Sequence, residues 1–158
     1  MIADIPEKEH KGWFILLGIS LLLSPFQISA YIFEIYDLIS SNAWEDLITI
    51  SSSHYIPNFQ YLVLCELSFY ILMLLAWIYI IYLFFTKNYK FPKIFIIISL
   101  TYLFFILVDT FVASLFLKDI AQNDTEIRII AIYCLIWITY IKKSQRVKNT
   151  FVKKKPVE

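Results

Sequence analysis

The chain has 158 residues, of which 59% are hydrophobic, 18% aromatic and 17% charged, and its formal net charge is +1. A soluble domain usually carries roughly 25% charged residues, and a chain of this length cannot enclose such an apolar excess in a core of its own. The composition therefore excludes an ordinary soluble domain and indicates that lipid surrounds much of the chain.

Four apolar runs follow one another along the chain. A helix needs about 20 mostly apolar residues to cross roughly 30 Å of hydrocarbon. The runs cover residues 13–36, 61–85, 94–117 and 127–141, and the fourth is the shortest. An outer loop, 37–60, joins the first two, and a basic tail, 142–158, follows the last. We predict an all-α integral membrane protein whose four transmembrane helices form one bundle over residues 1–158.

The first run has a competing interpretation as a cleaved signal peptide, because lysines precede the apolar residues 13–23 and residues 28–30 resemble a cleavage site. Ile28 is bulky for such a site, however, and apolar character resumes through Ile35. A membrane span is therefore the favoured interpretation.

Short signals mark the other helices. Pro57 precedes the second run, and Pro92 suits the first turn of the third. Asn123 lies three residues before Glu126, as in a capping box at the start of the fourth. In the outer loop, residues 44–48 predict a short amphipathic helix on the outer surface, with an ordered loop as the alternative.

The distribution of positive charge predicts the orientation. In a four-span protein the two tails and the loop between the second and third spans lie on one side, which is cytoplasmic when it is rich in Lys and Arg. These segments hold 12 of the 14 basic residues, whereas six acidic residues lie on the other side. We therefore expect both the N- and C-termini in the cytoplasm. The basic residues are Lys8, Lys11, Lys87, Lys90, Lys93, Lys142, Lys143, Arg146, Lys148, Lys153, Lys154 and Lys155.

The end of the chain carries its most distinctive motif, Ser-x-Arg-Val-Lys-x-Thr-Phe over residues 144–151, after Trp137 and Tyr140. It resembles the close of a bacterial membrane family named domain of unknown function 2569. The resemblance implies an inner-membrane protein with four helices and implies no known activity. Further similar elements are Gly12-Trp13, Leu23-Ser24-Pro25, Trp44 with Leu47 and Thr49, Tyr55 with Pro57, Glu66, Phe84-Phe85, Phe91-Pro92 and Asp109.

Ionisable residues inside the spans are functional candidates by default. Glu66 and Asp109 lie within the second and third runs, while Glu34 and Arg128 lie near the outer ends of the first and fourth. Glu66 and Arg128 are at similar depth, so we predict that they form an ion pair. Asp109 is deeper, and we expect it to be protonated or bonded to hydroxyl groups such as that of Tyr102.

Helical spacing predicts which faces turn inward, because lipid disfavours polar stripes. Three of the runs carry such a face. The faces are Ser20, Ser24, Gln27, Tyr31 and Glu34 in the first run, Glu66, Tyr70, Met73 and Trp77 in the second, and Ser99, Tyr102 and Asp109 in the third.

These polar residues admit two interpretations. They hold helices together, or they line an outward-facing acidic cavity for a cation or a polar headgroup. The candidate ligand- or ion-binding residues are Glu66, Asp109, Glu34, Gln27, Tyr31 and Tyr102.

The sequence offers no nucleophile–base pair, Gly-rich loop or metal-ligand spacing, so we expect no catalytic residue, metal site or cofactor. Cys65 and Cys134 are isolated within apolar runs and suit buried positions. A non-catalytic accessory or scaffold protein is the expected function. A small transporter or ligand-binding protein is the alternative, and an intramembrane lipid enzyme is a third.

The expected partners are the lipid bilayer and another membrane protein. We expect the basic tail to contact anionic headgroups at the cytoplasmic face through Lys142, Lys143, Arg146 and Lys148, with a simple topology anchor as the alternative. Nucleic acid is not an expected partner, since no base-stacking aromatic residues accompany these charges.

Overall fold

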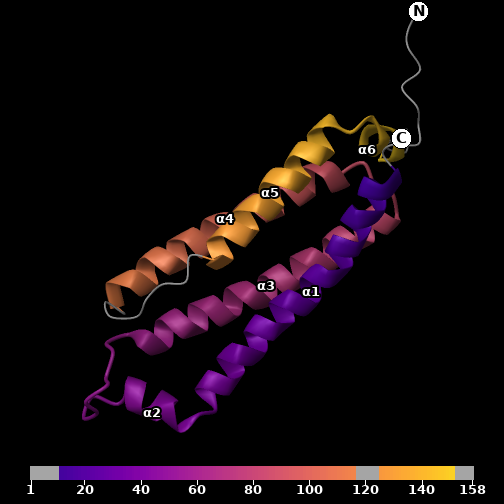
Figure 1. Cartoon of the computed structure of the whole chain (residues 1–158). Helices are drawn as coiled ribbons and strands as arrows, with labels where there is room; N and C mark the ends of the chain where they lie inside the picture. The colour runs from indigo at the N-terminus through magenta and orange to yellow at the C-terminus, as the bar shows by residue number, and fades with distance from the viewer. Residues whose placement is uncertain (1–10, 117–124, 152–158) are drawn as a thin grey trace, which may run out of the picture.

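The computed structural model describes residues 11–116 and 125–151, and the elements within those ranges are α-helices (Figure 1). The all-α class expected from the sequence is confirmed. The helices are α1 (Lys11–Ile39), α2 (Asn42–Ile48), α3 (Phe59–Phe85), α4 (Phe91–Phe116), α5 (Thr125–Lys143) and α6 (Gln145–Thr150).

Three helices are long and apolar enough to cross a membrane: α1 over Gly12–Ile39, α3 over Phe59–Phe85 and α4 over Phe91–Leu115. The chain is therefore a multi-pass membrane protein. Helix α5 has 19 residues and carries Arg128 near its start and lysines in its last turn. Its uncharged stretch, residues 129–141, is about 20 Å long at 1.5 Å per residue, which is shorter than the hydrocarbon layer.

Helices extend beyond the apolar runs that marked them, because backbone hydrogen bonds continue into the polar interface until a turn interrupts them. Between α3 and α4 that turn is short. Lys87 adopts a left-handed conformation with φ 51°, and the backbone N–H of Asn88 donates to the carbonyl of Leu83 (3.0 Å). This is a common way to end a helix, and it makes α3 and α4 antiparallel neighbours.

The membrane helices form an open row. Helix α1 packs against α3, α3 against α4, and α4 against α5, whereas α1 and α5 are not among the closely packed pairs. Figure 1 shows α1 beside α3 and α5 beside α4. The row therefore begins with α1 and ends with α5, and these two helices pack less closely than the pairs within the row.

The short helix predicted for residues 44–48 is confirmed: it is part of α2, which packs against one end of α1 and α3. Its position on the outer surface of the membrane stays a prediction. The half-buried Trp44 ring lies 6.1 Å from the Phe59 ring at the start of α3, centroid to centroid. Pro57 and Pro92 flank the helix starts as expected, while Asn123 lies outside the described residues.

Four phenylalanines gather at the opposite end of the bundle, one each from α1, α3 and α4 and one that follows α6. Phe151 is buried, and its ring lies 4.4 Å from Phe91, 5.8 Å from Phe84 and 6.1 Å from Phe14. Ser144 caps α6 by accepting a hydrogen bond from the backbone N–H of Val147 (3.3 Å). The distinctive C-terminal motif thus folds back and closes this end.

The start of α1 and the end of α5 meet at that same end. The Trp13 ring lies 6.2 Å from both Trp137 and Tyr140. The α3–α4 turn and α6 are also there, while α2 and the end of α4 lie at the other end, and α5 begins part-way along α4 (Figure 1).

Candidate functional site

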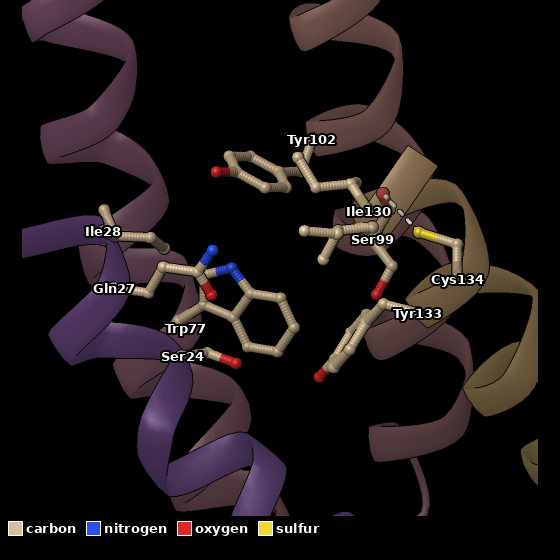
Figure 2. A pocket seen from close by; sticks show the side chains of 10 residues that line it. Ser24, Gln27, Ile28, Trp77, Ser99, Tyr102, Ile130, Tyr133 and Cys134 are labelled. Atoms are coloured by element: carbon tan, nitrogen blue, oxygen red, sulfur yellow. Dashed lines mark hydrogen bonds between the residues drawn. The ribbon is translucent and has the colours of Figure 1, made fainter. Parts of the chain in front are cut away.

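A cavity of about 60 Å³ lies between the four long helices near the middle of their length (Figure 2). Since one water occupies about 10–15 Å³ by this measure, the cavity has room for about four waters or a small chemical group. Ten residues line it: Ser24, Gln27 and Ile28 of α1, Trp77 of α3, Ser99 and Tyr102 of α4, and Ile129, Ile130, Tyr133 and Cys134 of α5.

Helix α4 presents the inner wall because its buried side chains recur every three or four residues. Phe95, Ser99, Tyr102 and Ile106 are all buried and lie on this face. The two polar members are one turn apart and open into the space between α1 and α5 (Figure 2). The inward face predicted for this span, with Ser99 and Tyr102 on it, is therefore confirmed.

Ser99 is 1% exposed, yet its hydroxyl oxygen has no hydrogen-bond partner among the described residues. Serines in membrane helices commonly donate to a carbonyl one turn earlier, as Ser24 does to the carbonyl of Ser20 (2.9 Å). The Cys134 thiol donates a hydrogen bond to the backbone carbonyl of Ser99 (3.5 Å) and not to its hydroxyl. The Ser99 hydroxyl therefore remains available to the cavity.

The Tyr133 hydroxyl also borders the cavity. It is directed toward Ser24 of α1 (Figure 2) and interacts with the side chains of Ser20 and Ser24, although no hydrogen bond of regular geometry forms there. The protons of both serines already go to carbonyls of their own helix, Ser20 to Leu17 at 2.8 Å and Ser24 to Ser20. Their oxygens thus retain lone pairs as acceptors.

The cavity adjoins an open groove of about 460 Å³ between α1 and α5, and the two share Ile129 and Tyr133. The groove is apolar except for two hydroxyl-bearing residues, and it runs toward the end of the bundle where Trp13 and Trp137 meet. It exists because α1 and α5 do not pack closely. Its lining is Trp13, Leu16, Ile19, Ser20 and Leu23 of α1 and Ile129, Ile132, Tyr133, Ile136 and Trp137 of α5.

Two of the six predicted ligand-binding residues, Gln27 and Tyr102, line the cavity. Tyr31 is adjacent, because its hydroxyl accepts a hydrogen bond from the Gln27 amide (3.5 Å) and its ring stacks on Tyr70 at 5.4 Å. The cavity is thus built by neutral groups.

The predicted acidic residues lie elsewhere. Glu66 and Asp109 are half-buried and Glu34 is exposed, and none of the three is among the residues that line the cavity. Glu66, Asp109 and Arg128 each interact with other groups. The pairing of Arg128 with Glu66 stays a prediction.

The polar stripe predicted for α1 lies beside its most buried face rather than on it. Leu17, Leu21 and Ile28 are buried, whereas Gln27 and Glu34 are exposed. The physical reason is that α1 packs against α3 through apolar side chains, whereas its polar side borders the cavity and the groove, which α5 does not fill.

Tyr133 and Cys134 were missed as site residues because no inward face was assigned to the fourth run. A signal was present, since α5 buries Ile130, Cys134, Trp137 and Ile141, which follow helical spacing. Tyr133 lies beside this face, at the edge that borders α1.

In the basic tail, Lys142, Lys143 and Lys148 are exposed, and their contact with lipid headgroups stays a prediction. Arg146 is half-buried, and its guanidinium carbon lies 5.3 Å from the centre of the Phe14 ring. This cation–π contact ties α6 to α1. Across residues 11–116 and 125–151, no cluster of three or more His, Cys, Asp or Glu side chains could hold a metal ion.

A family model described as "Protein of unknown function (DUF2569)" matches residues 9–152. The match includes all six helices, so the cavity and the groove lie entirely within it. It confirms the resemblance expected from the C-terminal motif. Comparisons with curated proteins and with solved structures found no match.

Proposed function

The chain belongs to the DUF2569 family of proteins of unknown function, and we propose that it is a bacterial inner-membrane protein that binds a bilayer-dissolved molecule from the side. One observation carries this proposal: the buried hydroxyl of Ser99, which has no partner in the described structure, lines a cavity that adjoins an open apolar groove. Buried polar groups are normally hydrogen-bonded, so such exceptions indicate a place for a ligand.

The proposal takes α5 as a fourth span. Its exposed side chains include Ile129, Ile132 and Leu135, which suit lipid better than water. The Arg128 and Lys142 side chains are long enough to extend from a short helix toward the headgroups, which offsets the missing length.

We place both ends of the described chain on the cytoplasmic side. The lysines of the α3–α4 turn and the basic residues after α5 are at the same end of the bundle as the start of α1. This is the arrangement that the positive-inside rule favours.

Access to the cavity runs through the membrane rather than through water. The groove between α1 and α5 opens sideways, and its apolar lining suits acyl chains or other lipophilic molecules. A molecule already dissolved in the bilayer reaches Tyr133 along this groove without crossing a polar interface.

The chemistry of the lining supports a binding role, because it consists of hydroxyl, amide, indole, thiol and aliphatic groups. General acid–base catalysis uses a titratable group tuned to ambient pH within reach of the substrate, and no carboxylate, imidazole or amine is part of this lining. The accessory or scaffold role expected from the sequence stays a prediction.

Filling the groove tests the proposal. Ile132 is 56% exposed and lines the groove, so Ile132→Trp places an indole where the ligand would lie. Protein purified in mild detergent from its host is extracted with organic solvent, and the extract is analysed by mass spectrometry. We expect a lipophilic molecule enriched over bulk membrane lipid with the wild type and depleted with Ile132→Trp.

Leu135→Trp is the matched control, because Leu135 lies on the same helix, is 71% exposed and is not part of the groove. This variant should retain the molecule. If the wild-type extract has the composition of bulk lipid, or if Ile132→Trp retains as much ligand as Leu135→Trp, lateral binding through this groove is wrong.

A further inference from the structure

We propose that the occupant is an uncharged single-chain lipid whose hydroxyl or carbonyl head binds Ser99 and Tyr133 in the cavity while its chain lies in the α1–α5 groove. This inference rests on the proposed lateral binding and specifies the ligand. It draws on the hydrogen-bonding needs of the cavity, on its charge, and on the sizes of the cavity and the groove.

The head must accept hydrogen bonds. The Ser99 hydroxyl carries a proton that no described residue accepts, and the Tyr133 hydroxyl has only a contact of irregular geometry with Ser20 and Ser24. A ligand oxygen between α4 and α5 would receive either proton. A hydroxyl head could also donate, because Ser24 has given its own proton to the Ser20 carbonyl and keeps lone pairs free. An alcohol or carbonyl oxygen meets these needs, whereas a hydrocarbon end meets none.

The head must also be uncharged. The cavity lies near mid-membrane, since Ser24 and Cys134 are close to the middle of α1 and α5. None of the described residues that line it is Lys, Arg, Asp or Glu, and a charge held at this depth without a counter-ion is costly. Carboxylate, phosphate and ammonium heads are therefore disfavoured.

Size limits the ligand further. A cavity of about 60 Å³ accepts a head of a few non-hydrogen atoms. From Leu23 back to Trp13 the groove follows α1 for about 15 Å at 1.5 Å per residue, and each of its two sides is a single helix. This elongated, narrow apolar surface suits one extended chain.

The test uses three 16-carbon photoprobes that share a mid-chain diazirine and a terminal alkyne and end in an alcohol, a carboxylate or a methyl group. Each probe is added to the purified protein in lipid nanodiscs, illuminated, and mapped by peptide mass spectrometry. We expect the alcohol to label the groove sides of α1 and α5 most strongly, and excess unlabelled hexadecanol to compete with it.

Two variants connect this labelling to the head. Ser99→Ala and Tyr133→Phe should each lower the apparent affinity for the alcohol probe about fivefold, the effect of one lost hydrogen bond, and leave the methyl probe unchanged. The controls are Ser68→Ala and Tyr82→Phe on the exposed face of α3, which should change neither. If Ser99→Ala impairs folding, the effect of Tyr133→Phe alone decides whether the head of the ligand binds in the cavity.

The outcomes separate the two proposals. Two results would overturn the neutral head but leave lateral binding intact. One is equal labelling of the groove by the three probes that Ser99→Ala and Tyr133→Phe do not change. The other is strongest labelling by the carboxylate probe. Lateral binding is overturned as well if labelling of the groove is no stronger than labelling of the exposed face of α3 and no unlabelled competitor reduces it.

Discussion

Ser99 illustrates the cost of a cavity that presents buried hydroxyls. A buried polar group without a partner destabilises a protein by about 1–3 kcal/mol, and the Ser99 hydroxyl is such a group within the described residues. Replacement by Ala would remove that cost, so the presence of Ser99 is better explained by something it binds than by folding alone. The same hydroxyl would be unremarkable on the lipid-facing side of a helix, where a serine bonds its own backbone as Ser68 does with the carbonyl of Leu64 (2.7 Å).

Charge reversal tests the predicted pair at the residue scale. Glu66→Arg and Arg128→Glu alone should each lower the thermal unfolding midpoint in detergent, because each would place like charges together in a poorly hydrated region. The double variant should recover most of the loss.

A charge reversal at the exposed residue Glu34 is the control and should have little effect. A double variant no more stable than the sum of the two single changes would show that Glu66 and Arg128 are not paired.

At the scale of elements, α6 is held by its final aromatic residue. Phe151 is 5% exposed and stacks on Phe91. Phe151→Ala should destabilise the protein by about 3 kcal/mol, since truncating a buried Phe leaves a cavity, and it should release the C-terminal segment to protease. Thermal unfolding followed by tryptophan fluorescence, together with limited proteolysis, measures both effects.

Phe85→Ala is the comparison, because Phe85 is 61% exposed on the neighbouring face of α3. Equal melting temperatures for the two variants would mean that α6 does not contribute to the stability of the bundle.

Some elements could be predicted from their residues and others could not. The inward faces of α3 and α4 follow from spacing, and Tyr70, Trp77 and Tyr102 are buried as predicted. The polar stripe on α1 correctly predicted that Gln27 lies at the site, but it did not predict that this side chain is exposed. Periodicity identifies a face of a helix and does not say whether a neighbouring helix covers that face. At Gly18, where α1 lies close to α3, an added Cβ would lie 3.3 Å from the Phe84 ring, so a larger residue there would require that ring to shift.

For the molecule as a whole, the topology depends on whether α5 crosses the membrane, and cysteine labelling tests this. A membrane-impermeant maleimide should label Ser53→Cys from outside intact cells, and should label Lys90→Cys and Asn149→Cys only after permeabilisation. All three positions are exposed, and the native cysteines lie within α3 and α5.

Wild-type protein controls for labelling of those native cysteines. Labelling of Lys90→Cys and Asn149→Cys from opposite sides of the membrane would show that α4 and α5 do not both cross it, and the proposed four-span arrangement would be wrong.

The sequence by itself determined that this protein is helical, lies in a membrane and belongs to its family, because hydrocarbon demands long apolar segments that can be recognised one at a time. Only the tertiary structure decided that α1 and α5 pack loosely and leave a groove between them, that the side chains lining the central cavity are neutral, and that Tyr133 faces Ser24 across it. Those features depend on which helices pack together. Packing is settled by side-chain volumes at contacts between distant residues, such as Gly18 with Phe84, and no property of a single segment carries that information.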